Sequence, residues 1–181
     1  MRIPVHDLDT APKDSHDPLD RQARRVGKVI NIFGAMANSP ALIEMYDLVE
    51  SHLAENSNLD DATRQAIHLS VAAVNECGYC QAAYTGAATA AGFDEEETIA
   101  IRQGRLPDDP KLEALLSLCR QIADNRGYVD DSVWEGALAN GWSREEVLDA
   151  YAEVIRTVLT NYFNHLVGTD LDLPEAPPLV G

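Results

Sequence analysis

The chain has 181 residues, with 14 Lys or Arg against 30 Asp or Glu, so its formal net charge at pH 7 is -16. This charge repels nucleic-acid phosphates and anionic lipid surfaces, so neither is expected as a partner. No segment approaches the roughly 20 apolar residues of a membrane span, and the polar start of the chain lacks a signal-peptide centre, so we expect no membrane segment and a cytoplasmic location.

The length suits one well-filled domain between two ends of different character. We expect residues 1–38 to form an N-terminal arm with a short helix, residues 39–168 a helical domain, and residues 169–181 a Pro-rich tail. Both ends are interrupted by prolines, at Pro4, Pro12, Pro18, Pro174, Pro177 and Pro178. Either end could be free or could lie over a neighbouring subunit.

Helix-capping signals divide the central region into a series of helices, and strand signals are nearly absent. The first expected helix begins at Ser39-Pro40. The others, in chain order, run from Asp60 or Asp61 to Asn75, over Gln81–Ala91 before a stop at Gly92, from Asp94 to Gly104, from Asp109-Pro110 to near Gly127, over about 131–139, and from Ser143 to Gly168. An all-α fold is therefore predicted.

Two of the three cysteines, Cys77 and Cys80, form a Cys-x-x-Cys motif where the Ala-rich helix Gln81–Ala91 is expected to begin. The unpaired backbone N–H groups and the positive end of the helix dipole favour the thiolate form at such a place. This argument makes Cys77, which is nearer the helix start, the more activated sulfur. The pair is able to close a disulfide.

Other interpretations of the motif are weaker. A structural zinc site needs four ligands, and no second close Cys/His pair exists, so neither a metal nor another cofactor is expected. Two cysteines could also be ordinary buried residues. Cys119 fits that description, because it lies on an apolar helical stripe. That stripe consists of Leu112, Leu115, Leu116, Cys119, Ile122 and Ala123.

From Ser39 to Gly168, the layout resembles the AhpD-like alkylhydroperoxidases of the carboxymuconolactone decarboxylase-like superfamily. The resemblance rests on Asn-x-Cys-x-Tyr-Cys after an acid-capped helix, then an Ala-rich helix, Gly-Phe, a short acidic helix and Asn161-Tyr162-Phe163-Asn164-His165 in the last helix. It implies a helical bundle with the motif at the N-terminus of a central helix. It also implies that Cys80 attacks peroxide to form a sulfenic acid, which Cys77 resolves as a disulfide.

The family's Glu/His proton relay is changed in this chain. Gln65 stands at the glutamate's place, twelve residues before Cys77, and Tyr84 stands at the histidine's place, four after Cys80. An amide does not titrate and a phenol has a pKa near 10, so neither is a base at pH 7.

Three residues are candidates to support the cysteines in place of that relay. His68 and Glu76 are spaced to share a helix face with Gln65, and either could deprotonate a thiol. Their alternative roles are a structural histidine and a solvated charge. Tyr84 could instead donate a hydrogen bond to the Cys80 thiolate and stabilise it.

The predicted function is that of a peroxiredoxin-type alkylhydroperoxidase, a thiol-dependent peroxidase or disulfide oxidoreductase. The expected partners are an organic hydroperoxide and a disulfide or lipoyl-type reductant, and the resemblance implies a homo-oligomer, a trimer or hexamer. One alternative is a carboxymuconolactone decarboxylase-like lactone enzyme, for which Arg64 and Arg102 are the nearest cationic candidates. The other is a non-enzymatic redox-binding oligomer that has lost the relay.

Overall fold

A computed structural model describes residues 1–106 and 108–179, and within them the fold is helical without a strand. The last two residues of the predicted tail lie outside this range. After a short 3-10 helix, Lys13–Ser15, the helices are α1 His16–Val26, α2 Asn31–Met36, α3 Pro40–Asn56, α4 Asp61–Val74, α5 Gly78–Ala90, α6 Glu95–Arg102, α7 Pro110–Asp124, α8 Asp131–Ala139 and α9 Arg144–Val167. The predicted all-α fold is confirmed. No helix in the described ranges is both long and apolar enough to cross a bilayer.

The predicted helix starts are confirmed by their hydrogen bonds. Asp60 Oδ1 accepts from the backbone N–H of Thr63 at the start of α4. Complete capping boxes, Asp94 with Glu97 and Ser143 with Glu146, open α6 and α9. These side chains satisfy N–H groups that would otherwise lack partners in the first helical turn.

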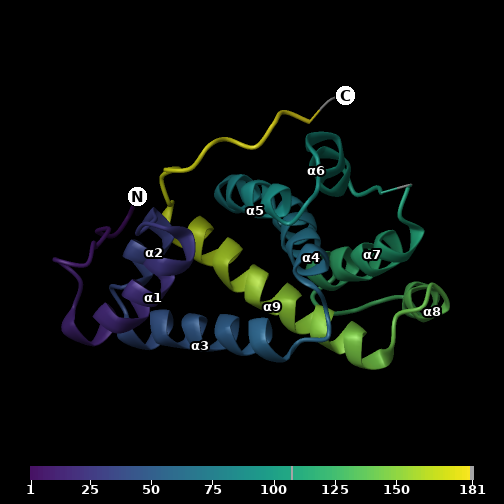
Figure 1. Ribbon diagram of the computed structural model, residues 1–181, viewed down its shortest axis with the longest axis horizontal. Coiled ribbons are helices and arrows are strands. Elements are labelled where there is room, and N and C mark those ends of the chain that lie inside the picture. Colours follow the sequence, from purple (N-terminus) through teal and green to yellow (C-terminus); the bar gives the residue numbers. More distant parts are fainter. Residues whose placement is uncertain (107, 180–181) are drawn as a thin grey trace.

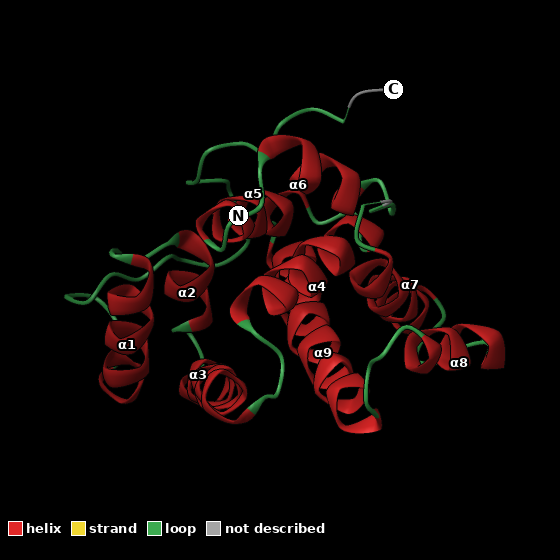
Figure 2. Ribbon diagram, turned by 45° about the vertical axis from the view of Figure 1, so that its right-hand side comes forward, coloured by secondary structure: helices red, strands yellow, loops and turns green. Residues whose placement is uncertain are grey.

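Helices α4 and α9 pack against each other and separate two groups of helices (Figures 1 and 2). On one side α4, α6, α7, α8 and α9 enclose an apolar core that contains Cys119. On the other side, the N-terminal segment and α3 enclose a second core that contains Cys77 and Cys80. The prediction that Cys119 is a core residue is confirmed, while the motif cysteines belong to a different core.

The N-terminal segment contributes more structure than the expected arm and short helix, because it forms both α1 and α2. Leu19, Ile32 and Met36 are each no more than 4% exposed and join the core around the motif. Helix α1 is otherwise polar, so only a few apolar residues signal its burial. The segment therefore builds one wall of the region that holds the cysteines.

The N-terminus lies beside the end of α9 and the start of the C-terminal tail, and the tail continues from there along the same chain (Figure 1). The backbone N–H of Arg2 donates to Val167 O at 2.7 Å. In the tail, Asp172 accepts a hydrogen bond from the Tyr79 hydroxyl at 2.8 Å, and Pro177 O accepts one from Arg102 Nη1. The tail is thus fastened to α5 and α6 of its own subunit.

Candidate active site

A sharp reversal between α4 and α5 places the two cysteines. Helix α4 ends at Val74, and Glu76 adopts the left-handed conformation with φ 53°, which turns the chain back so that Cys77 becomes the N-cap of α5. Cys80 follows within the first turn. Both cysteines are free and at most 2% exposed. The predicted position of the motif at a helix N-terminus is therefore observed.

The surroundings of the two sulfurs separate their pKa values. The pKa of Cys77 is lowered to about 6, first by a hydrogen bond from the Cys80 thiol and then by the Cys80 backbone N–H, by nearby His165 and by the Asn164 amide, although burial opposes them. The pKa of Cys80 is raised, because that hydrogen bond and the Cys77 charge hold its proton and because it is buried. In the resting dithiol the negative charge therefore resides on Cys77, as the helix-dipole argument predicts.

Helix α9 supplies the polar groups that face the sulfurs. Asn164 Nδ2 donates to Cys80 Sγ at 3.1 Å and lies 3.9 Å from Cys77 Sγ, and the Cys80 thiol contacts Thr160 Oγ1 at 3.9 Å. Asn161 Oδ1 accepts from Asn75 Nδ2 at 2.8 Å. The amides of Asn161 and Asn164 both lower the pKa of Cys80, so this helix favours negative charge on either sulfur.

We predict that Asn164→Leu raises the pKa of the more acidic thiol, Cys77, by about half a unit to one unit, because the Asn164 amide lies 3.9 Å from this sulfur. A hydrogen bond to a charged group contributes roughly 1.5–3 kcal/mol at ordinary length, a long contact contributes less, and one pKa unit is about 1.36 kcal/mol. The pH dependence of iodoacetamide alkylation, with each cysteine assigned by mass mapping, measures the shift. The control is Asn56→Leu at the exposed end of α3. An unchanged midpoint in Asn164→Leu would show that the amide does not stabilise the thiolate.

Cys80 faces a cavity of about 600 Å³, whereas Cys77 does not line it. Most of the wall is apolar. It comes from the N-terminal segment, α5 and the tail, and includes Ile30, Ile32, Phe33, Ala83, Ala87 and Leu173. This volume falls within the usual range of small-molecule sites, about 300–1,000 Å³. A molecule bound there reaches Cys80 before Cys77.

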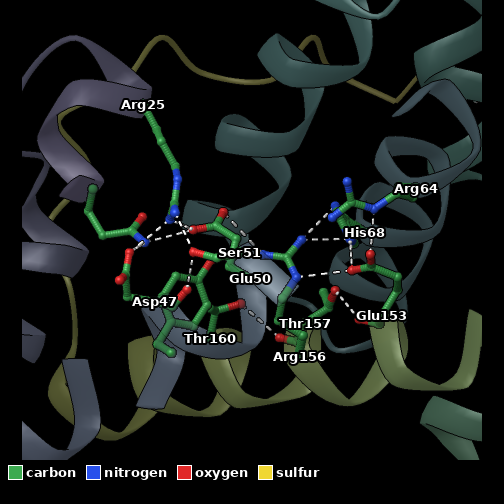
Figure 3. Close-up of polar contacts among 12 residues, drawn as sticks. Arg25, Asp47, Glu50, Ser51, Arg64, His68, Glu153, Arg156, Thr157 and Thr160 are labelled. Atoms are coloured by element: carbon green, nitrogen blue, oxygen red, sulfur yellow. Dashed lines mark hydrogen bonds and ion pairs between the residues drawn. The ribbon is translucent and has the colours of Figure 1, made fainter. Parts of the chain in front are cut away.

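A buried ionic cluster lies beside the cavity (Figure 3). Glu153, fully buried, accepts from Arg64 Nε at 2.5 Å, from Arg156 Nε at 3.0 Å and from His68 Nε2 at 2.8 Å. Burial alone would raise the pKa of Glu153, but these hydrogen bonds and charges hold it well below its usual value. Arg156 also donates to the Tyr46 hydroxyl at 2.8 Å and so joins α9 to α3.

His68 is neutral within this cluster. Burial and the Arg156 charge lower its pKa to about 4. Its Nε2 proton is fixed by the Glu153 carboxylate, and its Nδ1 faces Arg156 Nη2 at 3.0 Å. A neutral imidazole locked between these charges organises the cluster, and the structure gives it no contact with a sulfur.

Four of the predicted site residues are brought together. Gln65 Oε1 lies 3.3 Å from His68 Nδ1, the rings of His68 and Tyr84 have centroids 4.9 Å apart, and Gln65 and Tyr84 line the cavity with Cys80. Burial raises the pKa of Tyr84 to about 12, while the Thr160 hydroxyl acts in the opposite direction. Tyr84 is thus a neutral phenol near the residue that contacts Cys80. Its influence on Cys80 stays a prediction.

The prediction that Glu76 shares a face with Gln65 and His68 is wrong. The α4 hydrogen-bond pattern ends before it, and its left-handed backbone directs an exposed side chain away from the helix face. The helical spacing that included Glu76 predicted a helix two residues longer than α4, which ends at Val74. Only one of the two candidate arginines lines the cavity. Arg64 does so, whereas Arg102 lies outside the cavity and donates hydrogen bonds to Gln81 Oε1 and to the tail.

Sequence reasoning did not assign Glu153, Arg156, Thr160, Asn161 and Asn164 to the site. They lie on the inward face of α9 among residues such as Val154, and all five are at most 5% exposed. Several polar residues at buried positions of one amphipathic helix are the signal that could have identified them.

These features define an all-α protein with a buried dithiol at a helix start, and solved structures share its helical fold. Residues 40–121 match the carboxymuconolactone decarboxylase family. This match covers helices α3 to α6 and most of α7, which is under half of the chain. No curated protein matches it significantly.

Similar solved structures share the fold at low sequence identity. An "alkylhydroperoxidase AhpD core: uncharacterized peroxidase-related protein" from Ralstonia eutropha JMP134 has a TM-score of 0.83 and 19% identity, over 94% of this chain and 92% of that one. A peroxidase-related protein from Silicibacter sp. TM1040 has a TM-score of 0.80 and 17% identity, over 94% of this chain and 90% of that one. The debrominase Bmp8, in complex with 2,3,4-tribromopyrrole, has a TM-score of 0.81 and 13% identity, over 95% of this chain and 91% of that one. The fold therefore hosts more than one chemistry.

Proposed function

We propose that the protein is a thiol-dependent peroxidase or disulfide oxidoreductase of the alkylhydroperoxidase type that uses the Cys77/Cys80 dithiol. The observation that carries the proposal is the division of labour between the sulfurs. Cys80 faces an apolar cavity and accepts a hydrogen bond from Asn164 Nδ2, while Cys77 lies outside the cavity. An organic hydroperoxide suits the apolar wall.

The reaction begins with a proton transfer inside the pair. The Cys77 thiolate takes the proton of the hydrogen-bonded Cys80 thiol, and Asn164 Nδ2, 3.1 Å from Cys80 Sγ, stabilises the charge that arrives there. This transfer supplies a nucleophile without the base that Gln65 and Tyr84 do not provide.

The remaining steps oxidise the dithiol by two electrons. The Cys80 thiolate attacks the terminal peroxide oxygen, the O–O bond breaks, and the alkoxide takes a proton and leaves as the alcohol. The Cys77 sulfur then attacks the Cys80 sulfenic acid, forming the S–S bond and releasing water. The sum is dithiol plus ROOH to disulfide plus ROH plus H₂O. A dithiol reductant, of the lipoyl or protein-thiol type, restores the pair by exchange.

Reaction with cumene hydroperoxide followed by counting free thiols tests the proposal. We expect two of the three thiols per chain to disappear, with the disulfide mapped to Cys77 and Cys80 and Cys119 still reduced. Burial raises the pKa of Cys119 to about 12, which keeps it unreactive. A bridge to Cys119, or retention of all three thiols, would favour the lactone enzyme or the non-enzymatic module.

We also propose that the chain forms a homo-oligomer through α9 and α3. Helix α9 exposes Leu148, Tyr151, Ile155, Tyr162 and Leu166, each between 47% and 66%. These residues recur at helical spacing, and α3, which packs against α9, adds exposed Met45, Leu48 and Val49. A stripe of this extent is typical of a subunit interface.

Sedimentation at micromolar concentration should therefore show a trimer or hexamer rather than a 19.8 kDa species. Ile155→Glu should shift the protein towards that monomer mass, because it places a charge within the stripe. Tyr128→Glu, at a residue that is 82% exposed but lies before α8, serves as the control. A monomeric wild-type protein would refute the proposed assembly.

A further inference from the structure

Most charged groups that line the cavity already have partners. Glu50 Oε2 accepts from Arg25 Nη1 at 2.7 Å, and Asp61 Oδ1 accepts from Gln65 Nε2 at 3.0 Å. Arg156 donates to Glu153, Tyr46 and His68 from its three nitrogens. These groups have little hydrogen-bonding capacity left for a ligand.

Arg64 differs from them. Its side chain is 10% exposed, and its Nε is bonded to Glu153 Oε1, which fixes the guanidinium plane. Within the described residues, Nη1 and Nη2 make no hydrogen bond, and neither is fully enclosed by protein atoms. A rigid, nearly buried guanidinium thus presents two free donors at a cavity wall.

We propose that Arg64 is the anion-binding group of this cavity and that the natural substrate is an apolar molecule bearing a single carboxylate. Two nitrogens on one guanidinium edge match the two oxygens of a carboxylate. The apolar wall fits the rest of such a molecule. The neighbouring Glu50 and Asp61 carboxylates oppose a second negative charge, which disfavours a phosphate dianion. The identity of the reactive group at Cys80 rests on the proposed function, but the recognition of the carboxylate does not.

The first test measures ligand binding to the wild-type protein and needs no turnover. Calorimetry compares 4-isopropylbenzoate with 4-isopropylbenzamide, which has the same apolar body without the charge. A charge-assisted pair predicts about 10- to 100-fold tighter binding of the carboxylate. Equal affinities, or no binding of either compound at millimolar concentration, would overturn the proposal.

The second test assigns the preference to Arg64. Arg64→Met should abolish the difference between the two ligands and Arg64→Lys should retain part of it. Arg24→Met should leave it unchanged, because Arg24 is an exposed arginine of α1 that pairs with Asp20. If Arg64→Met does not fold, because Glu153 loses a partner, the wild-type comparison and Arg64→Lys still decide the question. If the Arg64→Met variant folds and still binds the carboxylate more tightly than the amide by the full wild-type factor, another group must bind the carboxylate.

Kinetics separate this inference from the proposed function. The substrates are cumene hydroperoxide with a para carboxylate and the methyl ester of the same compound, which share a reactive end. We expect kcat/KM to favour the acid by about 10- to 100-fold, mainly through KM, and the preference to vanish in Arg64→Met. If the protein binds the benzoate selectively but consumes neither hydroperoxide, the peroxidase proposal fails and the carboxylate site stands. If it consumes both equally, the carboxylate site fails.

Discussion

Replacement of Cys80 by serine should lower the rate of hydroperoxide reduction by at least about 10³-fold, because a hydroxyl is a far weaker nucleophile than a thiolate. Cys77→Ser should behave differently. Since Cys80 faces the cavity, it should still be oxidised once per chain, but more slowly, because the Cys77 thiolate that takes its proton is gone. Without a resolving sulfur the sulfenic acid should persist. Stopped-flow measurement of peroxide consumption and trapping of the sulfenic acid with dimedone distinguish the two variants.

Cys119→Ser is the matched control for these variants and should consume peroxide at the wild-type rate. Cys119 is fully buried in the core away from the motif, so its thiol does not reach the cavity. Dimedone labelling of Cys77 in Cys80→Ser would reverse the assigned roles. It would mean that the sulfur with the lower pKa, rather than the sulfur facing the cavity, attacks the peroxide.

Glu153→Gln should lower the free energy of unfolding by about 3–5 kcal/mol. The substitution keeps the shape of the side chain, but it leaves Arg64 and Arg156 buried without their shared counter-charge. Urea denaturation at pH 7.5 measures the change. Glu135→Gln, at an exposed position of α8, should stay within about 0.5 kcal/mol of wild type. A similarly small change for Glu153→Gln would mean that the cluster does not hold the fold together.

The same cluster should make the protein sensitive to acid. Folded His68 stays neutral down to about pH 4, whereas its unfolded pKa is 6.5, so the unfolded chain binds more protons between these values. The contribution of His68 to the free energy of unfolding, roughly 3 kcal/mol, is therefore fully present above pH 6.5 and is lost as the pH falls towards 4. Glu153, whose pKa is lowered overall, adds a loss below its unfolded value near 4.5. In His68→Gln the unfolding free energy should vary less between pH 6.5 and 4, and an unchanged slope would contradict this.

The local signals in the sequence were sufficient for the helices and for the position of the motif. Caps such as Asp94 with Glu97 act within one turn, so neighbouring residues determine them. Local signals were not sufficient at Glu76. The helical spacing of the sequence continued through this residue, but its positive φ depends on how α4 and α5 pack. Likewise, Leu19 and Ile32 give little sign that the N-terminal segment encloses the cysteines.

The remainder of the site depends on long-range packing. Asn164 meets Cys80 across 84 positions, and Glu153 meets His68 across 85. The family pattern pointed to Gln65 and Tyr84, which do lie at the cavity, but the charges beside them come from α9. A single sequence contains no signal that pairs such distant residues.

The cavity draws its lining from both sides of the family-matched region, residues 40–121. Phe33 precedes that region, and Arg156, Thr160 and Leu173 follow it. Mutations in the flanking segments can therefore reshape the space in front of Cys80 while leaving the motif helix untouched. In evolutionary terms, the chemistry and the choice of substrate can diverge separately. Two relatives that share the dithiol need not accept the same molecule, and enzymes with new preferences are best sought by varying α2 and the tail.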